Sequence, residues 1–96
     1  MGETDDFEWD DEKDAANRNK HGLPLPLAVR LFDGRPRLDR PSRGERGEAR
    51  FETIAAYGDD VLMCAWTWRR HRRRAISFRY ANEVERRAYQ EAIGRS

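Results

Sequence analysis

The stretch "VLMCAWTWRRHRRRAISFRY", Val61 to Tyr80, decides the fold, because it holds two strand patterns joined by a charged turn. Residues 61–68 are apolar on both faces, as is typical of a central strand. Residues 73–80 alternate strictly, which predicts a strand with two different faces. One predicted face carries Arg73, Ala75, Ser77 and Arg79, and the other carries Arg74, Ile76, Phe78 and Tyr80. The short turn between the two strands implies that they pair antiparallel.

The sequence upstream of this hairpin predicts further strands and two helices. "RFETIAAY" at 50–57 is a third long strand pattern, and Gly58, Asp59 and Asp60 supply the turn that follows it. Before it we expect, in order, a short strand at 7–9, a helix from the N-cap Asp10 through Lys20 to a stop at Gly22, a second short helix at 26–32, and an edge strand with a long exposed loop over 35–50.

The end of the chain predicts one more helix. A capping box from Asn82 to Glu85 marks its start, and the apolar pattern predicts that it buries Val84, Ala88 and Ala92. The expected fold class is therefore α+β, with two N-terminal helices, an antiparallel sheet of three to four strands and a C-terminal helix.

Length and composition fit one small domain over residues 1–96, with residues 1–6 as a flexible acidic lead. The chain is polar, with 38% hydrophobic and 39% charged residues, but ten aromatic residues argue against a disordered chain. No apolar stretch is long enough to span a bilayer, and the acidic N-terminus is unlike a signal peptide, so we expect a cytoplasmic protein.

The single cysteine, Cys64, lies in an apolar run, which predicts a buried and inert thiol rather than a nucleophile. No cysteine and histidine residues have the spacing of a zinc site. We therefore expect neither a metal nor another cofactor.

The net charge of +1 hides a strong asymmetry. Residues 1–14 hold eight acids and one base, which gives −7, and the remainder holds 18 bases and ten acids, which gives +8. Arginine supplies 17 of the 19 basic residues, and five arginines with one histidine fill the turn at 69–74. Guanidinium groups bind phosphate in a bidentate fork, so the turn is either a phosphate-binding surface or a solvated hairpin tip.

Three segments carry a resemblance to a known family. "FEWDDEKDAANRNKHGL" (7–23) is similar to an opening F-x-W-D-x-x-K-x-x-x-N-x-x-K-H-G pattern. "GEARFETIA" (47–55) is similar to a glycine-acid-x-R-F stretch, and "RRRAISFRYANEVERRAYQ" (72–90) to an R-x-I-S-x-R-x-A…E-R-x-x-Y ending. In this order and at these separations, they resemble the BrnT family, the toxin half of a type II toxin–antitoxin pair.

This resemblance implies a RelE-like ribonuclease fold and metal-independent cleavage of RNA that arrests growth when it is unopposed. It also implies neutralisation by a BrnA-type antitoxin with a ribbon-helix-helix DNA-binding part. DNA is then a partner only through the toxin–antitoxin complex, which represses its own promoter.

RNA cleavage without a metal needs a base or an orienting group at the 2′-OH, cations for the phosphorane and a proton donor for the 5′ oxygen. We expect the catalytic residues to be Arg79, Arg50, His21 and Lys20. We expect the RNA-binding residues to be Arg69, Arg70, Arg72, Arg73, Arg74 and Ser77, with Trp68 either in the core or stacked on a base.

Each catalytic candidate also has a purely structural interpretation. His21 lies at a helix C-terminus, where the dipole favours a charged general acid, but it also fits a capping role. Lys20 is either a phosphate contact or a helix-end lysine. Arg79 instead fits an ion pair with the final helix, for instance with Glu83, and Glu48 is either a base or the ion-pair partner of Arg50.

Two functional hypotheses follow from these candidates. The first is a small endoribonuclease toxin, and the second is a non-catalytic module whose basic face docks an acidic protein partner or a nucleic acid. The acidic N-terminus fits a solvated tail, a repulsive guard beside the RNA or part of an antitoxin-facing surface.

Overall fold

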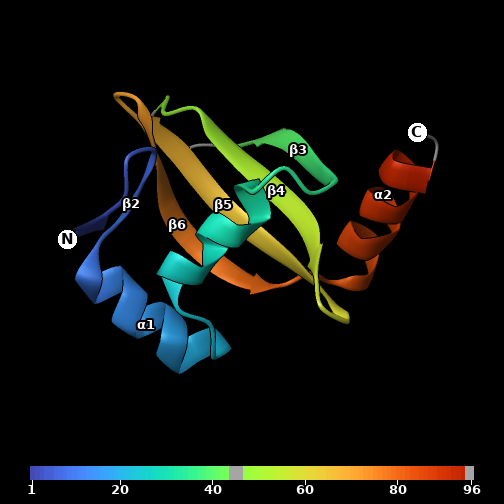
Figure 1. Cartoon of the computed structure of the whole chain (residues 1–96), viewed down its shortest axis with the longest axis horizontal. Helices are drawn as coiled ribbons and strands as arrows, with labels where there is room; N and C mark the ends of the chain where they lie inside the picture. The colour runs from blue at the N-terminus through green and yellow to red at the C-terminus, as the bar shows by residue number, and fades with distance from the viewer. Residues whose placement is uncertain (44–46, 95–96) are drawn as a thin grey trace.

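A six-stranded mixed sheet forms the centre of the fold (Figure 1). The computed structural model describes residues 1–43 and 47–94 of the chain. The elements, in chain order, are β1 (Gly2–Glu3), β2 (Phe7–Trp9), α1 (Asp11–His21), the 3-10 helix η1 (Leu25–Phe32), β3 (Arg37–Ser42), β4 (Arg50–Tyr57), β5 (Asp60–Arg69), β6 (Arg72–Tyr80) and α2 (Glu83–Gly94). The strand order is β1-β2-β6-β5-β4-β3, and only β2 and β6 pair in parallel.

The expected arrangement of two N-terminal helices on an antiparallel sheet of three to four strands is wrong. The chain begins with two strands, the sheet has six strands and is mixed, and the second helix is a 3-10 helix. The parallel pairing joins Phe7 and Glu8 to Arg73 and Arg74, which are 66 positions away along the chain. A pairing of two residues in each strand, between segments so far apart in the sequence, produces no hydrophobic pattern from which it could be predicted.

The locally determined elements are confirmed. The strands predicted at 50–57, 61–68 and 73–80 are β4, β5 and β6. Asp10 caps α1 by accepting a hydrogen bond from Lys13 N, and Gly22 ends α1 in the left-handed conformation. Part of the loop expected over 35–50 is β3, and the part at 44–46 lies outside the described residues.

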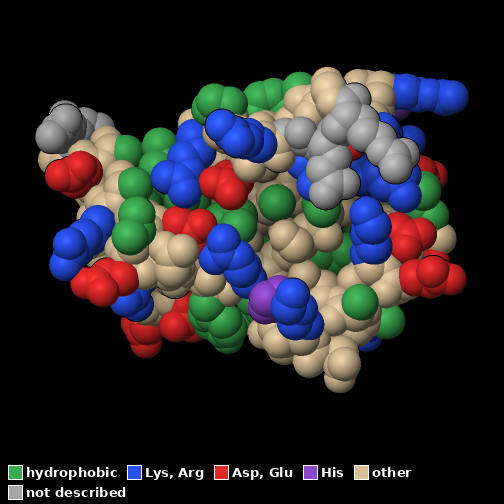
Figure 2. Space-filling view, turned by 180° about the vertical axis from the view of Figure 1, so that it is seen from behind, with side chains coloured by type: hydrophobic (Ala, Val, Ile, Leu, Met, Phe, Trp, Pro, Cys, Tyr) green, Lys and Arg blue, Asp and Glu red, His purple; other side chains and the backbone are tan. Residues whose placement is uncertain are grey.

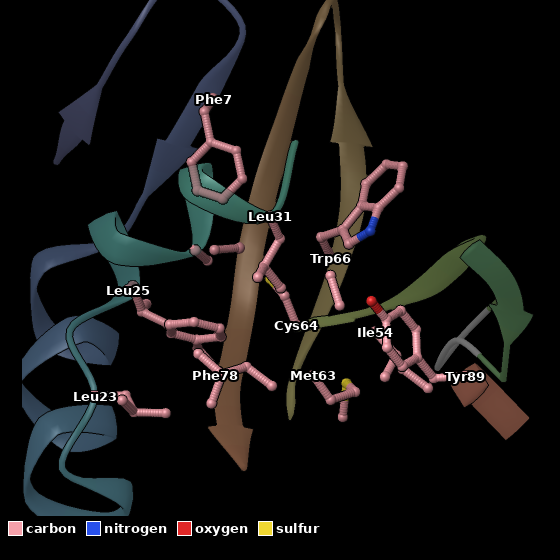
Figure 3. Close-up of a cluster of buried hydrophobic side chains, with 14 residues drawn as sticks. Phe7, Leu23, Leu25, Leu31, Ile54, Met63, Cys64, Trp66, Phe78 and Tyr89 are labelled. Carbon is pink, nitrogen blue, oxygen red and sulfur yellow. The ribbon is translucent and has the colours of Figure 1, made fainter. Parts of the chain in front are cut away.

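The two faces of the sheet are covered by different helices. Alternation along β4, β5 and β6 places Thr53, Cys64 and Phe78 under η1, on what we call the η1 face. The opposite α2 face carries Ile54 and Met63, which pack near Tyr89 of α2 (Figure 3). Cys64 is fully buried, and burial raises the pKa of its thiol, as expected for an inert cysteine.

The buried side of α2 differs from the expected one. Val84 is 73% exposed and Ala92 is also exposed, whereas Glu85 and Tyr89 are the buried residues of the helix. The prediction was wrong because it ranked positions by apolarity alone. Burial of Glu85 is stabilised by the arginine that it binds on the sheet.

A β-bulge interrupts the predicted alternation of β6. Ala65 pairs with Ser77 and Trp66 with Ala75, so Ile76 is an extra residue in β6. Odd-numbered residues of β6 therefore point to one face before the bulge and to the other face after it. Arg73 lies on the η1 face, and Arg79 lies on the α2 face. The predicted face that combined these two arginines is therefore wrong.

Buried polar side chains fix α1 against the edge of β6. The Asn17 amide donates to Phe78 O at 2.7 Å and accepts from Phe78 N at 3.0 Å, as a neighbouring strand would. It also donates to Leu23 O at 2.7 Å, and Asp14 accepts from Leu25 N at 2.8 Å. Together these bonds position α1 and the segment that follows it.

We predict that Asn17→Ala lowers the free energy of unfolding by about 3 kcal/mol, because buried backbone groups of Leu23 and Phe78 lose their partners. Urea unfolding followed by circular dichroism measures this change. Asn19→Ala is the matched control, since Asn19 is exposed on the same helix, and its effect stays within about 0.5 kcal/mol. Equal losses in the two variants would show that Asn17 does not fix α1.

Candidate nucleic-acid interface

The α2 face carries most of the predicted site residues that the structure brings together. Arg50, Arg69, Ser77 and Arg79 lie on this face by strand alternation, and Lys20 and His21 lie at its β6 edge. Figure 2 shows this side of the molecule, away from η1, with lysine, arginine and a histidine around an area of smaller side chains. The catalytic candidates Arg50 and Arg79, which come from different strands, thus point to the same side of the sheet. They lie on the order of 15 Å apart.

Arg79 is held in a bidentate fork by a buried carboxylate. Its Nη1 and Nη2 donate to Glu85 Oε1 and Oε2 at 2.8 and 2.9 Å, and the Glu85 side chain is only 6% exposed. Arg40 Nη2 lies 3.8 Å from Glu85 Oε2. The hydrogen bonds from Arg79 lower the pKa of Glu85, and those same bonds raise the pKa of Arg79.

The alternative ion pair with the final helix therefore exists, but with Glu85 rather than Glu83. Glu85 has two functions, because its Oε1 also accepts the Asn82 N–H in the capping box. Arg79 Nη1 also donates to Tyr80 O at 3.2 Å, and 29% of the Arg79 side chain remains exposed.

A second charged group lies further along the same face, toward the hairpin. Glu48 contacts two arginines, with Oε2 3.8 Å from Arg50 Nη2 and Oε1 3.3 Å from Arg69 Nη2. Neither contact has hydrogen-bond geometry, and the buried atoms Glu48 Oε1 and Arg50 Nε have no hydrogen-bond partner within the described residues. Glu48 is thus an ion-pair partner of Arg50. The Glu48 carboxylate and the Arg50 guanidinium can each form a further hydrogen bond.

A hollow of about 400 Å³ lies between the sheet end and α2, and a smaller one of about 230 Å³ lies where α1 meets β6. The smaller hollow contains three of the predicted site residues, Lys20, His21 and Ser77. Its lining consists of Lys13, Ala16, Asn17, Lys20, His21, Ile76 and Ser77. The bulge at Ile76 and the bonds of Asn17 create this meeting point, because both act on the same stretch of β6.

The structure places Lys20 and His21 at the mouth of this hollow. Lys20 is exposed in the last turn of α1, and His21 is the half-buried final residue of the helix. Gly22 performs the capping, since its N–H donates to Arg18 O. Within the described residues the His21 ring makes no hydrogen bond, so it is available to a ligand.

The arginines of the hairpin tip do not form one common surface. Arg72 binds Glu3 and the Thr4 carbonyl, and Arg74 binds Glu8 at 3.1 Å. Arg70 is exposed in the turn with a positive φ of 57°.

Arg73 lies on the other side of the sheet from Arg79, among aromatic rings. The acidic residues Glu3 and Glu8 therefore neutralise two of the tip arginines. They do so through β1 and β2, which the sequence analysis placed partly in a flexible lead.

Arg40 and Glu52 were not predicted as site residues, and Glu85 was predicted only to cap α2. Arg40 Nε donates to Glu52 Oε1 at 3.0 Å, and these residues face each other across β3 and β4. Opposite charges at facing positions of two adjacent strands are a detectable signal once the register is known. The register depends on an edge strand that contains a proline, Pro41, and this proline concealed it.

Two further observations concern residues 1–43 and 47–94. No helix there is long and apolar enough to cross a membrane. Over the same residues, no group of three or more histidine, cysteine, aspartate or glutamate side chains is placed to hold a metal ion.

Comparison with known proteins adds a family. The family model described as "Ribonuclease toxin, BrnT, of type II toxin-antitoxin system" matches residues 9–85, which is most of the chain. Among curated proteins the chain has no match.

The Glu85 carboxylate predicts a specific dependence of stability on pH. Because its pKa is lowered in the folded state, its stabilising effect is complete above its ordinary value of 4.5 and is lost as the pH falls through the lowered value. We predict that Glu85→Gln lowers the free energy of unfolding at pH 7 by about 2 kcal/mol and flattens its decline below pH 4.5.

Urea unfolding between pH 7 and pH 3 measures both effects. Glu83→Gln is the matched control, because Glu83 is exposed on the same helix and, over residues 1–43 and 47–94, pairs only with exposed Arg87. If the two variants follow the same pH profile, Glu85 does not stabilise the fold through Arg79.

Proposed function

The chain belongs to the BrnT family of ribonuclease toxins of type II toxin–antitoxin systems, which confirms the resemblance, and from this premise we propose a specific activity. The protein is a metal-independent endoribonuclease that cleaves RNA in the cytoplasm. A BrnA-type antitoxin with a ribbon-helix-helix part neutralises it, and DNA is contacted only through that complex.

The hollow between α1 and β6 is the observation that carries this proposal. It gathers Lys20, His21 and Ser77 from two elements that Asn17 holds together. Arg79 lies two residues after Ser77 on the same face of β6, about 7 Å along the strand. A cation, an imidazole and a hydroxyl from Lys20, His21 and Ser77 thus line a space large enough for a phosphate, and Arg79 adds a second cation further along β6.

These groups match the requirements of cleavage by the neighbouring 2′-OH. The 2′ oxygen forms a bond to phosphorus while the bond from phosphorus to the 5′ oxygen breaks, and the 2′ proton passes to water. Arg79 and Lys20 stabilise the negative charge of the phosphorane, and Ser77 donates to a non-bridging oxygen. His21, at the C-terminus of α1, donates a proton to the leaving 5′ oxygen.

Glu85 positions Arg79 in this mechanism. A guanidinium fixed on both nitrogens by a buried carboxylate keeps one orientation, so little conformational entropy is lost when the phosphate binds. Arg50 and Arg69, further along the same face, are placed to bind flanking phosphates, where an RNA phosphate would displace the weak contacts of Glu48.

We predict that purified protein cleaves RNA in the presence of EDTA and leaves 2′,3′-cyclic phosphate and 5′-hydroxyl ends. His21→Asn and Lys20→Gln each lower kcat by about 100-fold or more, because each removes a group that acts in the transition state. Gel analysis of a labelled RNA with end-group mapping measures this. Addition of a candidate antitoxin stops the cleavage.

Arg79→Gln lowers kcat by a similar factor, and its melting temperature is recorded beside it because the variant leaves Glu85 without its fork. Arg87→Gln is the matched control, since Arg87 is exposed on α2 and does not line the hollow between α1 and β6. RNA that is bound but survives intact would favour the non-catalytic binding module. Full activity of His21→Asn and Lys20→Gln would remove the hollow from the mechanism.

A further inference from the structure

A second charged surface lies on the η1 face, outside the proposed cleavage site. The Arg73 guanidinium carbon lies 4.5 Å from the ring centre of Phe32 and 4.9 Å from those of Trp66 and Trp68. We call these four residues the aromatic platform. In Figure 3 Trp66 lies to the right of Leu31, in the upper part of the buried cluster.

The Arg73 guanidinium is influenced by the charges of Asp39 and Asp6 but is not in direct contact with either carboxylate. Within the described residues it has no ion pair, and its buried Nε has no hydrogen-bond partner. Burial first, and then the neighbouring Arg37, lower the pKa of Arg73, whereas the charges of Asp39 and Asp6 act in the opposite direction. Arg37 lies 4.9 Å from the ring centre of Phe32, and its own charge is paired with Asp39, whose Oδ2 lies 2.9 Å from Arg37 Nε.

Trp68 gives the platform an exposed ring beside this cation. Its side chain is among the exposed large hydrophobic ones, at 46%, and it meets Trp66 edge-on at 5.1 Å. The Arg73 guanidinium lies over one flat face of the Trp68 indole, so a base stacks on the exposed part of the ring that this contact leaves open. An exposed aromatic face next to an unpaired guanidinium has the two features that a nucleotide requires, a π surface and a positive charge.

We propose that the aromatic platform binds one nucleotide of single-stranded RNA, with its base stacked on Trp68 and its phosphate at Arg73. The proposal rests on the proposed function and adds a contact outside the cleavage site. An acidic peptide would satisfy Arg73 equally well, but it has no flat ring for Trp68. The platform therefore favours RNA over a protein partner.

The hairpin connects this surface to the other face of the sheet. Trp68 and Arg69 are consecutive in β5, so their side chains lie on opposite faces. An RNA strand that leaves the α2 face at Arg69 reaches Trp68 by crossing the end of the hairpin. Exposed Arg70 lies in the turn along this path.

The test uses a 2′-O-methyl RNA decamer, which binds but lacks the 2′-OH nucleophile, so the result does not depend on cleavage. We predict that Trp68→Ala weakens its binding by about 5-fold to 100-fold, while Trp68→Phe keeps most of the affinity. The same decamer without bases binds wild type and Trp68→Ala equally well. Tyr80→Ala is the matched control, because Tyr80 is an exposed aromatic residue at the far end of β6.

Arg73→Gln tests the phosphate contact separately. It weakens both decamers and reduces the slope of log affinity against log salt by about 0.7, as expected for one lost phosphate contact on a single strand. Fluorescence anisotropy measures all of these affinities. Unchanged binding in Trp68→Ala overturns the proposal even if RNA is cleaved, whereas uncleaved RNA with Trp68-dependent binding overturns only the nuclease mechanism.

A polyglutamate peptide of ten residues distinguishes the other occupant. If this peptide binds with an affinity that depends on Trp68 and Arg73, while the RNA decamer does not, the platform is a protein-docking surface and the proposal is wrong.

Discussion

The pair of hydrogen bonds between the Asn17 amide and the backbone of Phe78 is the constraint on which the rest of the structure depends. β2 pairs with β6 only at Arg73 and Arg74, so the edge of β6 is open beyond that point. A side-chain amide takes the place of a strand there, because it offers one donor and one acceptor. As a result α1 runs beside β6, and the end of α1 reaches Ser77.

The parts of the fold that depend on neighbouring residues were predictable from the sequence. The caps of α1, the capping box of α2 and the limits of β4, β5 and β6 follow from turn residues, side-chain caps and alternation. The parallel β2–β6 pairing and the 3-10 form of η1 were not predictable. They result from contacts between distant segments, which a single sequence does not display.

The candidate site, like the fold, was predictable only in part. Lys20, His21 and Ser77 were selected for their chemistry, and the fold places them in one hollow. The partner of Arg79 was not identified, because Glu85 already had a local explanation as a cap and nothing in the sequence indicates a second function. Arg73 was assigned to the wrong face, because one extra residue in a strand cannot be distinguished from regular alternation until its partner strand is known.

That extra residue has a consequence for how the strand distributes its positive charge. Because Ile76 is an extra residue, regular alternation counted from Arg79 gives the wrong side of the sheet for the arginines that precede it. Arg73 lies on the η1 face instead of sharing the α2 face with Arg79. Deleting one position would exchange the sides of every arginine that precedes it, with no change in the number of basic residues. The length of the strand, as much as its composition, therefore determines which side of the molecule an anionic polymer encounters first.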